Sequence, residues 1–184
     1  LACLQRVGPG RLDRIIVTHG DIDHISGLAA VQAAAGAQVI CHAVEKAVVE
    51  GRQRRAMGDS LLALAYGPAF DFVARTFLRY RPVAQVDELV LDKQTLVEGF
   101  QVVHVPGHTP GQIALFHPQR GILLAADALN NRGGKLGLPP AIATPRMDIA
   151  KDSIRKLAAL KGLQVVCFGH GLPLTEHAAE RMQA

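Results

Sequence analysis

The feature that most constrains this chain is a short apolar run that ends in a dense group of metal-binding side chains. The β-branched residues 15–17 favour a buried strand. They lead into four candidate ligands within six positions, namely His19, Asp21, Asp23 and His24. Imidazoles and carboxylates at this density repel one another, or are desolvated at a cost, unless a cation holds them. The alternative is a polar loop in which Asp23 only caps the helix that follows.

Three later apolar runs repeat this pattern, because each is followed by a single His or Asp. The runs and their polar residues are 100–105 with His108, 122–126 with Asp127, and 165–168 with His170. His108 lies in a turn made rigid by flanking prolines and glycines, whereas Asp127 or His170 taken alone could be an ordinary turn residue. Ligand sites in α/β proteins favour the carboxyl ends of strands. Seven candidates suffice for two metal ions that share one carboxylate, with a water completing the set.

The remaining histidines do not follow this pattern, and none of them is assigned to metal. His42 is expected at the surface or as a helix cap. His104 is expected inside a strand, where it would lie either in the core or beside the metal ligands. His117 is expected in a turn. His177 is expected on an exposed final helix.

Strands and helices alternate in the first part of the chain, which is typical of an α/β fold. The expected elements are a strand at 13–17, a helix at 25–35 capped by Gly36, a strand at 39–41 and a helix at 43–50. Residues 51–82 are rich in Arg, Ala and Leu with helical spacing. They predict a helical insertion that either packs on the domain or forms a lid or substrate wall. The length of 184 residues fits a single domain covering residues 1–184.

Short strands dominate the second part and predict an antiparallel meander. They are expected at 86–91, 95–97, 100–105, 112–116 and 122–126. A Gly- and Pro-rich loop is expected at 130–145, followed by an amphipathic helix at 147–160, a buried strand at 165–168 and a closing helix at 175–182.

Composition excludes some classes of protein. No apolar run approaches the roughly 20 residues of a membrane span. The net charge of +4 is too mild to indicate nucleic-acid binding, and Arg52, Arg54 and Arg55 are expected at a solvated helix end rather than in a polyanion site. The three cysteines form no Cys-x-x-Cys pair, so a disulfide framework is not expected. A reducing compartment fits, and we expect a cytoplasmic protein.

The motifs resemble those of the metallo-β-lactamase-fold hydrolases. The matching pieces are Thr18-His19-Gly20-Asp21-Ile22-Asp23-His24, Pro106-Gly107-His108-Thr109-Pro110-Gly111, Ala126-Asp127 and Gly169-His170-Gly171. The resemblance implies a four-layer αβ/βα sandwich with two metal ions, usually zinc. One ion would be held by His19, Asp21 and His108, and the other by Asp23, His24 and His170. Asp127 would bridge the ions, and a hydroxide between them would be the nucleophile.

The chain departs from the usual family pattern at three points. Asp21 stands where the first motif normally has His, which identifies a His-x-Asp-x-Asp-His subgroup. This carboxylate makes the first site harder, so we expect zinc, with manganese or iron as alternatives. Ala126 replaces the usual Gly before the bridging Asp. The strand-rich segment that normally precedes the first motif is missing, and we expect the chain to be truncated at its N-terminus.

The resemblance implies hydrolysis of an ester, thioester, lactone or amide bond in a small-molecule substrate. Asp23 would orient the hydroxide and carry a proton to the leaving group. Asp127 argues against the commonest subclass of true β-lactamases, which has Cys at that position. A nuclease or phosphodiesterase of the same fold is one alternative, although residues 109–126 leave no room for the domain that RNA-processing members insert there. A non-catalytic metal-binding protein is another.

Overall fold

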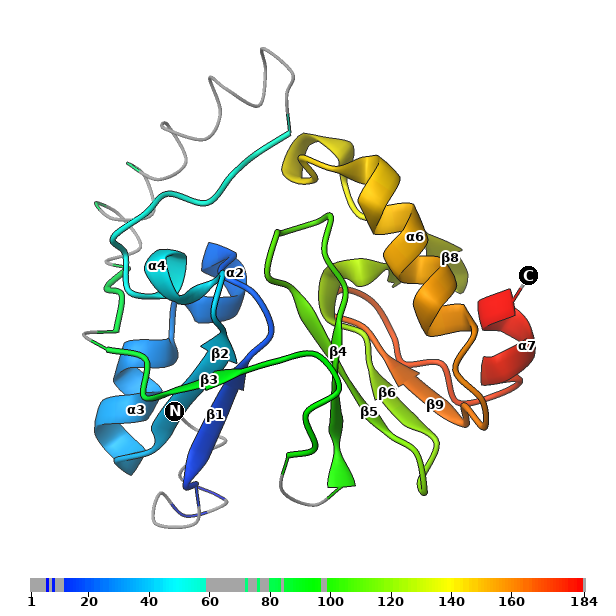
Figure 1. Cartoon of the computed structure of the whole chain (residues 1–184), viewed down its shortest axis with the longest axis horizontal. Helices are drawn as coiled ribbons and strands as arrows, with labels where there is room; N and C mark the ends of the chain where they lie inside the picture. Colours follow the sequence, from blue (N-terminus) through cyan, green and yellow to red (C-terminus); the bar gives the residue numbers. More distant parts are fainter. Residues whose placement is uncertain are drawn as a thin grey trace.

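The computed structural model describes residues 6, 8, 12–58, 72, 76, 80–83, 85–96 and 99–183. Two sheets face each other in the middle of the molecule (Figure 1). The first is parallel and consists, in order, of β1 (Arg14–Val17), β2 (Gln38–His42) and β3 (Glu88–Val90). The second consists, in order, of β4 (Gln101–His104), β5 (Ile113–His117), β6 (Ile122–Leu124) and β9 (Val165–Cys167).

Helices cover the outer face of each sheet. The first sheet carries α2 (Ile22–Ile25), α3 (Leu28–Ala35) and α4 (Lys46–Val49), and the second carries α6 (Met147–Ala158) and α7 (Ala178–Gln183). Two 3₁₀ turns, η3 (Ala126–Ala128) and η4 (Ala141–Ala143), and a hairpin of β7 (Asn130–Arg132) and β8 (Lys135–Gly137) complete the described elements. No helix in the described part of the chain is long and apolar enough to cross a membrane.

Three apolar cores hold these layers together. Ile40 and Val90 of the first sheet pack with Val102, Ile113 and Leu115 of the second. The two outer cores join each sheet to its helices, through residues such as Val39 and Leu28 on one side and Leu123 and Leu157 on the other. Because successive strand residues point to opposite faces, neighbours such as Val39 and Ile40 serve different cores. The predicted four-layer sandwich is therefore confirmed.

Several local predictions are corrected. The helix expected at 25–35 forms as α3, which starts only at Leu28, and a separate one-turn helix, α2, precedes it. The end of α3 at Gly36 is as predicted, and the φ of 67° there is easily reached only by glycine. The predicted meander is wrong at its first strand, since β3 pairs in parallel with β2, whereas β4, β5 and β6 pair antiparallel as predicted. The loop expected at 130–145 contains the β7–β8 hairpin.

The helices expected at 43–50 and 147–160 form as α4 and α6, although α4 is only one turn long. Most of the helical insertion expected at 51–82 lies outside the described residues. Its first part, residues 51–58, is not helical. This crossing segment (51–58) runs from α4 toward η4, where the Gly58 amide donates to the Ile142 carbonyl at 3.1 Å.

Candidate metal centre

The seven predicted side chains meet at one edge of the sandwich. His19 and Asp21 follow β1, and Asp23 and His24 lie on the short helix α2. The second sheet contributes the other three. Because β5 is antiparallel to both β4 and β6, and β9 is parallel to β6, the carboxyl ends of β4, β6 and β9 share an edge. His108, Asp127 and His170 follow those three ends.

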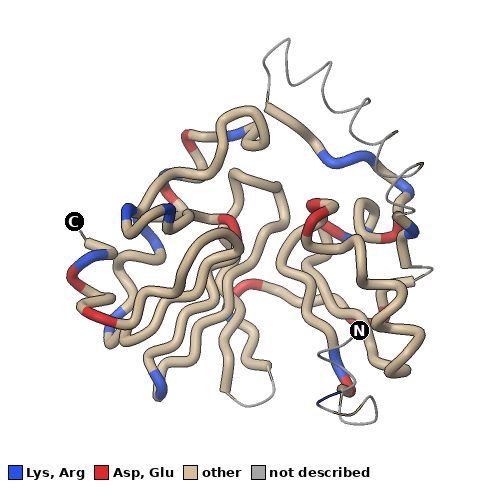
Figure 2. Tube along the Cα trace, turned by 180° about the vertical axis from the view of Figure 1, so that it is seen from behind, with Lys and Arg blue, Asp and Glu red and all other residues tan. Residues whose placement is uncertain are grey.

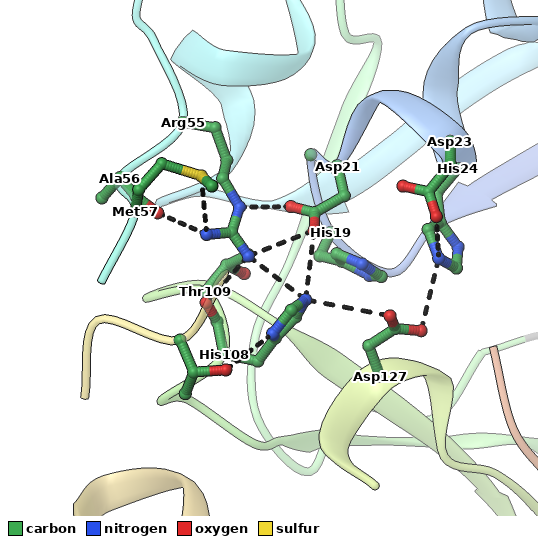
Figure 3. A network of polar contacts seen from close by, with 12 residues as sticks. His19, Asp21, Asp23, His24, Arg55, Ala56, Met57, His108, Thr109 and Asp127 are labelled. Atoms are coloured by element: carbon green, nitrogen blue, oxygen red, sulfur yellow. Dashed lines mark hydrogen bonds and ion pairs between the residues drawn. The ribbon is translucent and has the colours of Figure 1, made fainter. Parts of the chain in front are cut away.

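The potential ligands form two groups. The inner group is His19, His108 and Asp127, and the outer group is Asp23, His24 and His170; within each, the donor atoms lie within 4.8 Å of one another. Asp127 also contacts the outer group, with Oδ1 3.3 Å from His24 Nε2 and Oδ2 3.2 Å from His170 Nε2. Its Oδ2 lies 3.8 Å from His108 Nε2 (Figure 3). The Asp127 carboxylate thus lies between the two groups.

Buried polar atoms without hydrogen bonds show that the residues fit a cation. His19 Nε2 has no partner among the described residues, and His24 Nε2 and Asp127 Oδ1 have only ion-pair contacts, the shortest to each other at 3.3 Å. Leaving such an atom unpaired costs about 1–3 kcal/mol, and a divalent cation is a partner for both imidazole nitrogen and carboxylate oxygen. Without a cation or a proton between them, donor atoms at this spacing would place lone pairs against one another.

The Nδ1 atoms of His19 and His108 are held by threonines. Metal-binding histidines commonly have such a hydrogen-bond partner on the second ring nitrogen. Thr18 Oγ1 lies 3.0 Å from His19 Nδ1, and Thr144 Oγ1 lies 3.2 Å from His108 Nδ1. The Thr144 hydroxyl donates its proton to the Pro140 carbonyl at 2.8 Å, so its oxygen accepts from Nδ1–H of His108. The lone pair of His108 Nε2 is therefore directed into the site.

The surroundings shift the pKa values of His19, His24 and Asp127 in different directions. Burial lowers the pKa of His19 to about 3, so its ring is neutral and able to bind metal. The nearby Asp127 carboxylate raises the pKa of His24. Burial alone would raise the pKa of Asp127, but His24 and the other imidazoles outweigh that effect and keep it below its usual value.

Glu45 is an important residue that sequence reasoning missed. Its buried carboxylate accepts hydrogen bonds from the Gly20 amide at 2.8 Å, the Gly111 amide at 2.8 Å and the Thr109 hydroxyl at 2.7 Å. Gly20 belongs to the first motif, and the other two donors belong to the second. Glu45 thus joins the loops that carry His19 and His108, although its sequence position looks like any acidic residue of a surface helix.

Arg55 is the second residue that was missed, because the solvated helix end expected for residues 52–55 is wrong at this position. Only 12% of the Arg55 side chain is exposed. Its Nε donates to Asp21 Oδ1, and its Nη2 lies 3.1 Å from Asp21 Oδ2 and 3.2 Å from His108 Nε2 (Figure 3). Arg52, in contrast, is exposed and pairs with Glu50.

Asp21 therefore lies beside the inner group with a cation already bonded to both of its oxygens. Its Oδ2 is also 3.1 Å from His108 Nε2. Burial would raise the pKa of Asp21, but the His108 contact and the Arg55 charge outweigh it and hold the pKa far below its usual value. Asp21 is thus an anion beside the inner group, and Arg55 is bonded to both of its oxygens.

Gly169, which precedes His170, leaves space for the Asp127 carboxylate. A Cβ at this position would collide with that carboxylate and lie 2.9 Å from the His24 ring. Substitution would therefore push the carboxylate between the two groups out of place.

The four remaining histidines lie outside both groups, and the expected positions of two of them are corrected. His42 is a buried residue at the end of β2 and stacks on His104, with ring centroids 4.4 Å apart. His117 is buried in β5 rather than lying in a turn, and packs edge-on against Phe100. His104 ends β4 and contacts the Pro110 carbonyl through Nε2 at 2.9 Å. His177 is exposed and immediately precedes α7.

Comparison with known proteins identifies the family. The model of the metallo-beta-lactamase superfamily matches residues 2–170. The chain is 30% identical over 187 residues to the probable metallo-hydrolase YflN of Bacillus subtilis, a match that covers 93% of this chain and 69% of that protein. It is also 30% identical to a hydroxyacylglutathione hydrolase of Ectopseudomonas mendocina, covering 98% of this chain and 57% of the relative. The chain belongs to the metallo-β-lactamase superfamily.

Solved structures agree on the fold. The metallo-beta-lactamase family protein TTHA1429 of Thermus thermophilus is 25% identical with a TM-score of 0.67, and the match covers 99% of this chain and 62% of that one. The B3 metallo-beta-lactamase BLEG-1 is 23% identical with a TM-score of 0.69, covering 98% and 81%. The predicted family and its hydrolase class are thus confirmed. The chain spans about half the length of the hydroxyacylglutathione hydrolases it matches, 57% in one case and 49% in another.

Proposed function

We propose that the chain is a hydrolase that uses two divalent metal ions to cleave an acyl bond in a small molecule. The inner ion would be held by His19, His108 and Asp127, with Asp21 available to it, and the outer ion by Asp23, His24 and His170. Asp127 would bridge the two. The observation that carries this proposal is the position of the Asp127 carboxylate within 3.8 Å of ring nitrogens from both groups.

The donor set supports zinc, since imidazole and carboxylate together suit it, and manganese or iron remain the alternatives. When bound, such ions lower the pKa of a coordinated water to about 7 and polarise the acyl oxygen of the substrate.

The protein's own groups would supply orientation and proton transfer. Asp23 is 56% exposed, and its Oδ2 lies 3.1 Å from His170 Nε2, so it can accept a proton at the open side of the site. We propose that it orients the attacking water and passes the proton to the leaving group. Thr18 and Thr144 hold the rings of His19 and His108, and Glu45 holds the loops that carry them.

Among acyl bonds, we propose a thioester as the first candidate. The support is the similarity to proteins named hydroxyacylglutathione hydrolase, whose name denotes thioester hydrolysis, at 30% to 32% identity. Esters, lactones and amides use the same chemistry and belong in the same assay. A polyanionic substrate gains no support from Arg55, because its donors are bonded to Asp21, His108 and neighbouring groups of its own segment.

Metal analysis and a substrate panel test the proposal. The purified chain, loaded with Zn²⁺ and desalted, should retain about two ions and hydrolyse a thioester faster than a matched ester, lactone or amide. His108→Ala should lose the inner ion and most of the activity. His177→Ala, which changes an exposed histidine, should keep both. A folded chain that binds no metal, or a His108→Ala variant with full metal content and activity, would refute the proposal.

A further inference from the structure

Arg55 contacts side chains that the inner metal ion would need as ligands. The crossing segment (51–58) carries its guanidinium into the inner side of the metal centre, between Asp21 and His108 (Figure 3). Figure 2 shows basic residues on the segment that follows α4, close to acidic residues of the adjacent loop and helix. A monovalent cation of the protein therefore already neutralises a carboxylate that a metal ion would use.

Arg55 is in contact through all three of its nitrogens, with six acceptors for its five N–H donors. Nε and Nη2 form a fork on the two oxygens of Asp21, which is the geometry that arginine favours with carboxylates. Nη2 also contacts the His108 carbonyl at 3.1 Å, and Nη1 contacts the Ala56 carbonyl and Met57 Sδ. A guanidinium with every donor in use, and 12% exposed, is held in place rather than left free to bind substrate.

Arg55 and an inner metal ion would compete for the same lone pair. Nδ1 of His108 is bonded to Thr144, so the ring offers a single lone pair at Nε2. Arg55 Nη2 lies 3.2 Å from that atom and shares its two N–H groups among Nε2, the His108 carbonyl and Asp21 Oδ2, so it occupies the space that an ion bound to Nε2 would need. A metal ion that bound Asp21 would also have to displace Arg55, because Arg55 is bonded to both oxygens of Asp21. The outer group has no such neighbour among the contacts of its described residues.

We propose that Arg55 is an internal competitor for the inner metal ion. It holds Asp21 and His108 while the inner position is free of metal, and it must withdraw from His108 Nε2 before the inner ion binds. This inference rests on the proposed two-metal function and adds a regulation to it. The inner ion binds more weakly than the outer one because binding includes the cost of moving Arg55 and the segment that carries it.

The test is a zinc titration of the metal-free full chain with a competing chelator, comparing Arg55→Gln with the wild type. We expect two unequal sites in the wild type. Arg55→Gln should tighten the weaker site at least about tenfold and leave the stronger site unchanged. Arg55→Lys keeps the charge but loses the fork, so it should tighten the weaker site by a smaller factor. Arg155→Gln, which removes an exposed arginine that pairs with Asp152, should change neither site.

The possible outcomes distinguish the competitor role of Arg55 from the two-metal function. If two ions bind but Arg55→Gln leaves the weaker site unchanged or weakens it, Arg55 is not a competitor, and the proposed two-metal function stands. If the wild type binds no zinc, both fail. The Arg55→Lys variant keeps the test decisive should Arg55→Gln fold poorly.

Discussion

The two halves of the metal centre use similar ligands in very different surroundings. In the inner group, His19 and His108 are buried, and a guanidinium lies against the adjacent Asp21. In the outer group, Asp23 and His170 are 56% and 46% exposed. Similar donors therefore do not imply similar sites. We expect the protein's own charges to determine the metal affinity of the inner half. We expect the outer half to be open to solvent and substrate.

The largest effect is expected when the residue shared by the two halves is removed. Asp127→Ala should weaken metal binding at both sites and reduce hydrolysis by more than about a hundredfold. Even the loss of a residue that only hydrogen-bonds to a metal ligand lowers metal affinity or activity by about 10- to 100-fold. Metal content after desalting and the rate on a thioester check this. Asp152→Ala, an exposed carboxylate on α6, is the matched control. Loss of only one ion in Asp127→Ala would show that the carboxylate does not bridge.

Removing a ligand from one half should separate the sites. His170→Ala should lose the outer ion and retain the inner one, because none of the inner donors is changed. Metal stoichiometry by mass spectrometry under native conditions checks this, with His177→Ala as the control. The comparison of the two halves would be wrong if both ions left together.

A smaller effect is expected from the support beneath the inner half. Glu45→Gln keeps the shape but removes the charge that three donors share, so the free energy of unfolding should fall by about 1–3 kcal/mol. Urea denaturation measures it, and Glu180→Gln, an exposed change, should have little effect. The inner site should weaken more than the outer one, because Glu45 holds the loops of His19 and His108. Equal weakening would argue for a general loss of structure.

A further expected effect is a pH dependence of the metal-free chain. The folded-state pKa of His19 is about 3, below its usual value of 6.5, so the unfolded state binds the extra proton first. Stability contributed by the neutral ring is therefore present above pH 6.5 and falls as the pH drops toward 3, by about 1.4 kcal/mol per pH unit at most. Between about pH 7 and pH 5, the unfolding free energy of the wild type should drop more than that of His19→Gln. Parallel curves would contradict the low pKa.

The sequence predicts the candidate ligands but not the residues that surround them. The seven candidate ligands could be found because each follows an apolar run, and this pattern is local. Glu45 and Arg55 could not, because their roles depend on contacts between segments far apart in the chain. The parallel pairing of β3 with β2 was missed for the same reason. The β7–β8 hairpin did have a local signal, since Gly133 and Gly134, with φ of 58° and 83°, form a typical hairpin turn.

The most direct test of the central claim is anomalous diffraction at the zinc edge from crystals of the full chain soaked in Zn²⁺. Two peaks should flank the Asp127 carboxylate, one beside His19 and His108 and the other beside His24 and His170. A single peak, or peaks remote from Asp127, would contradict the bridged two-metal centre.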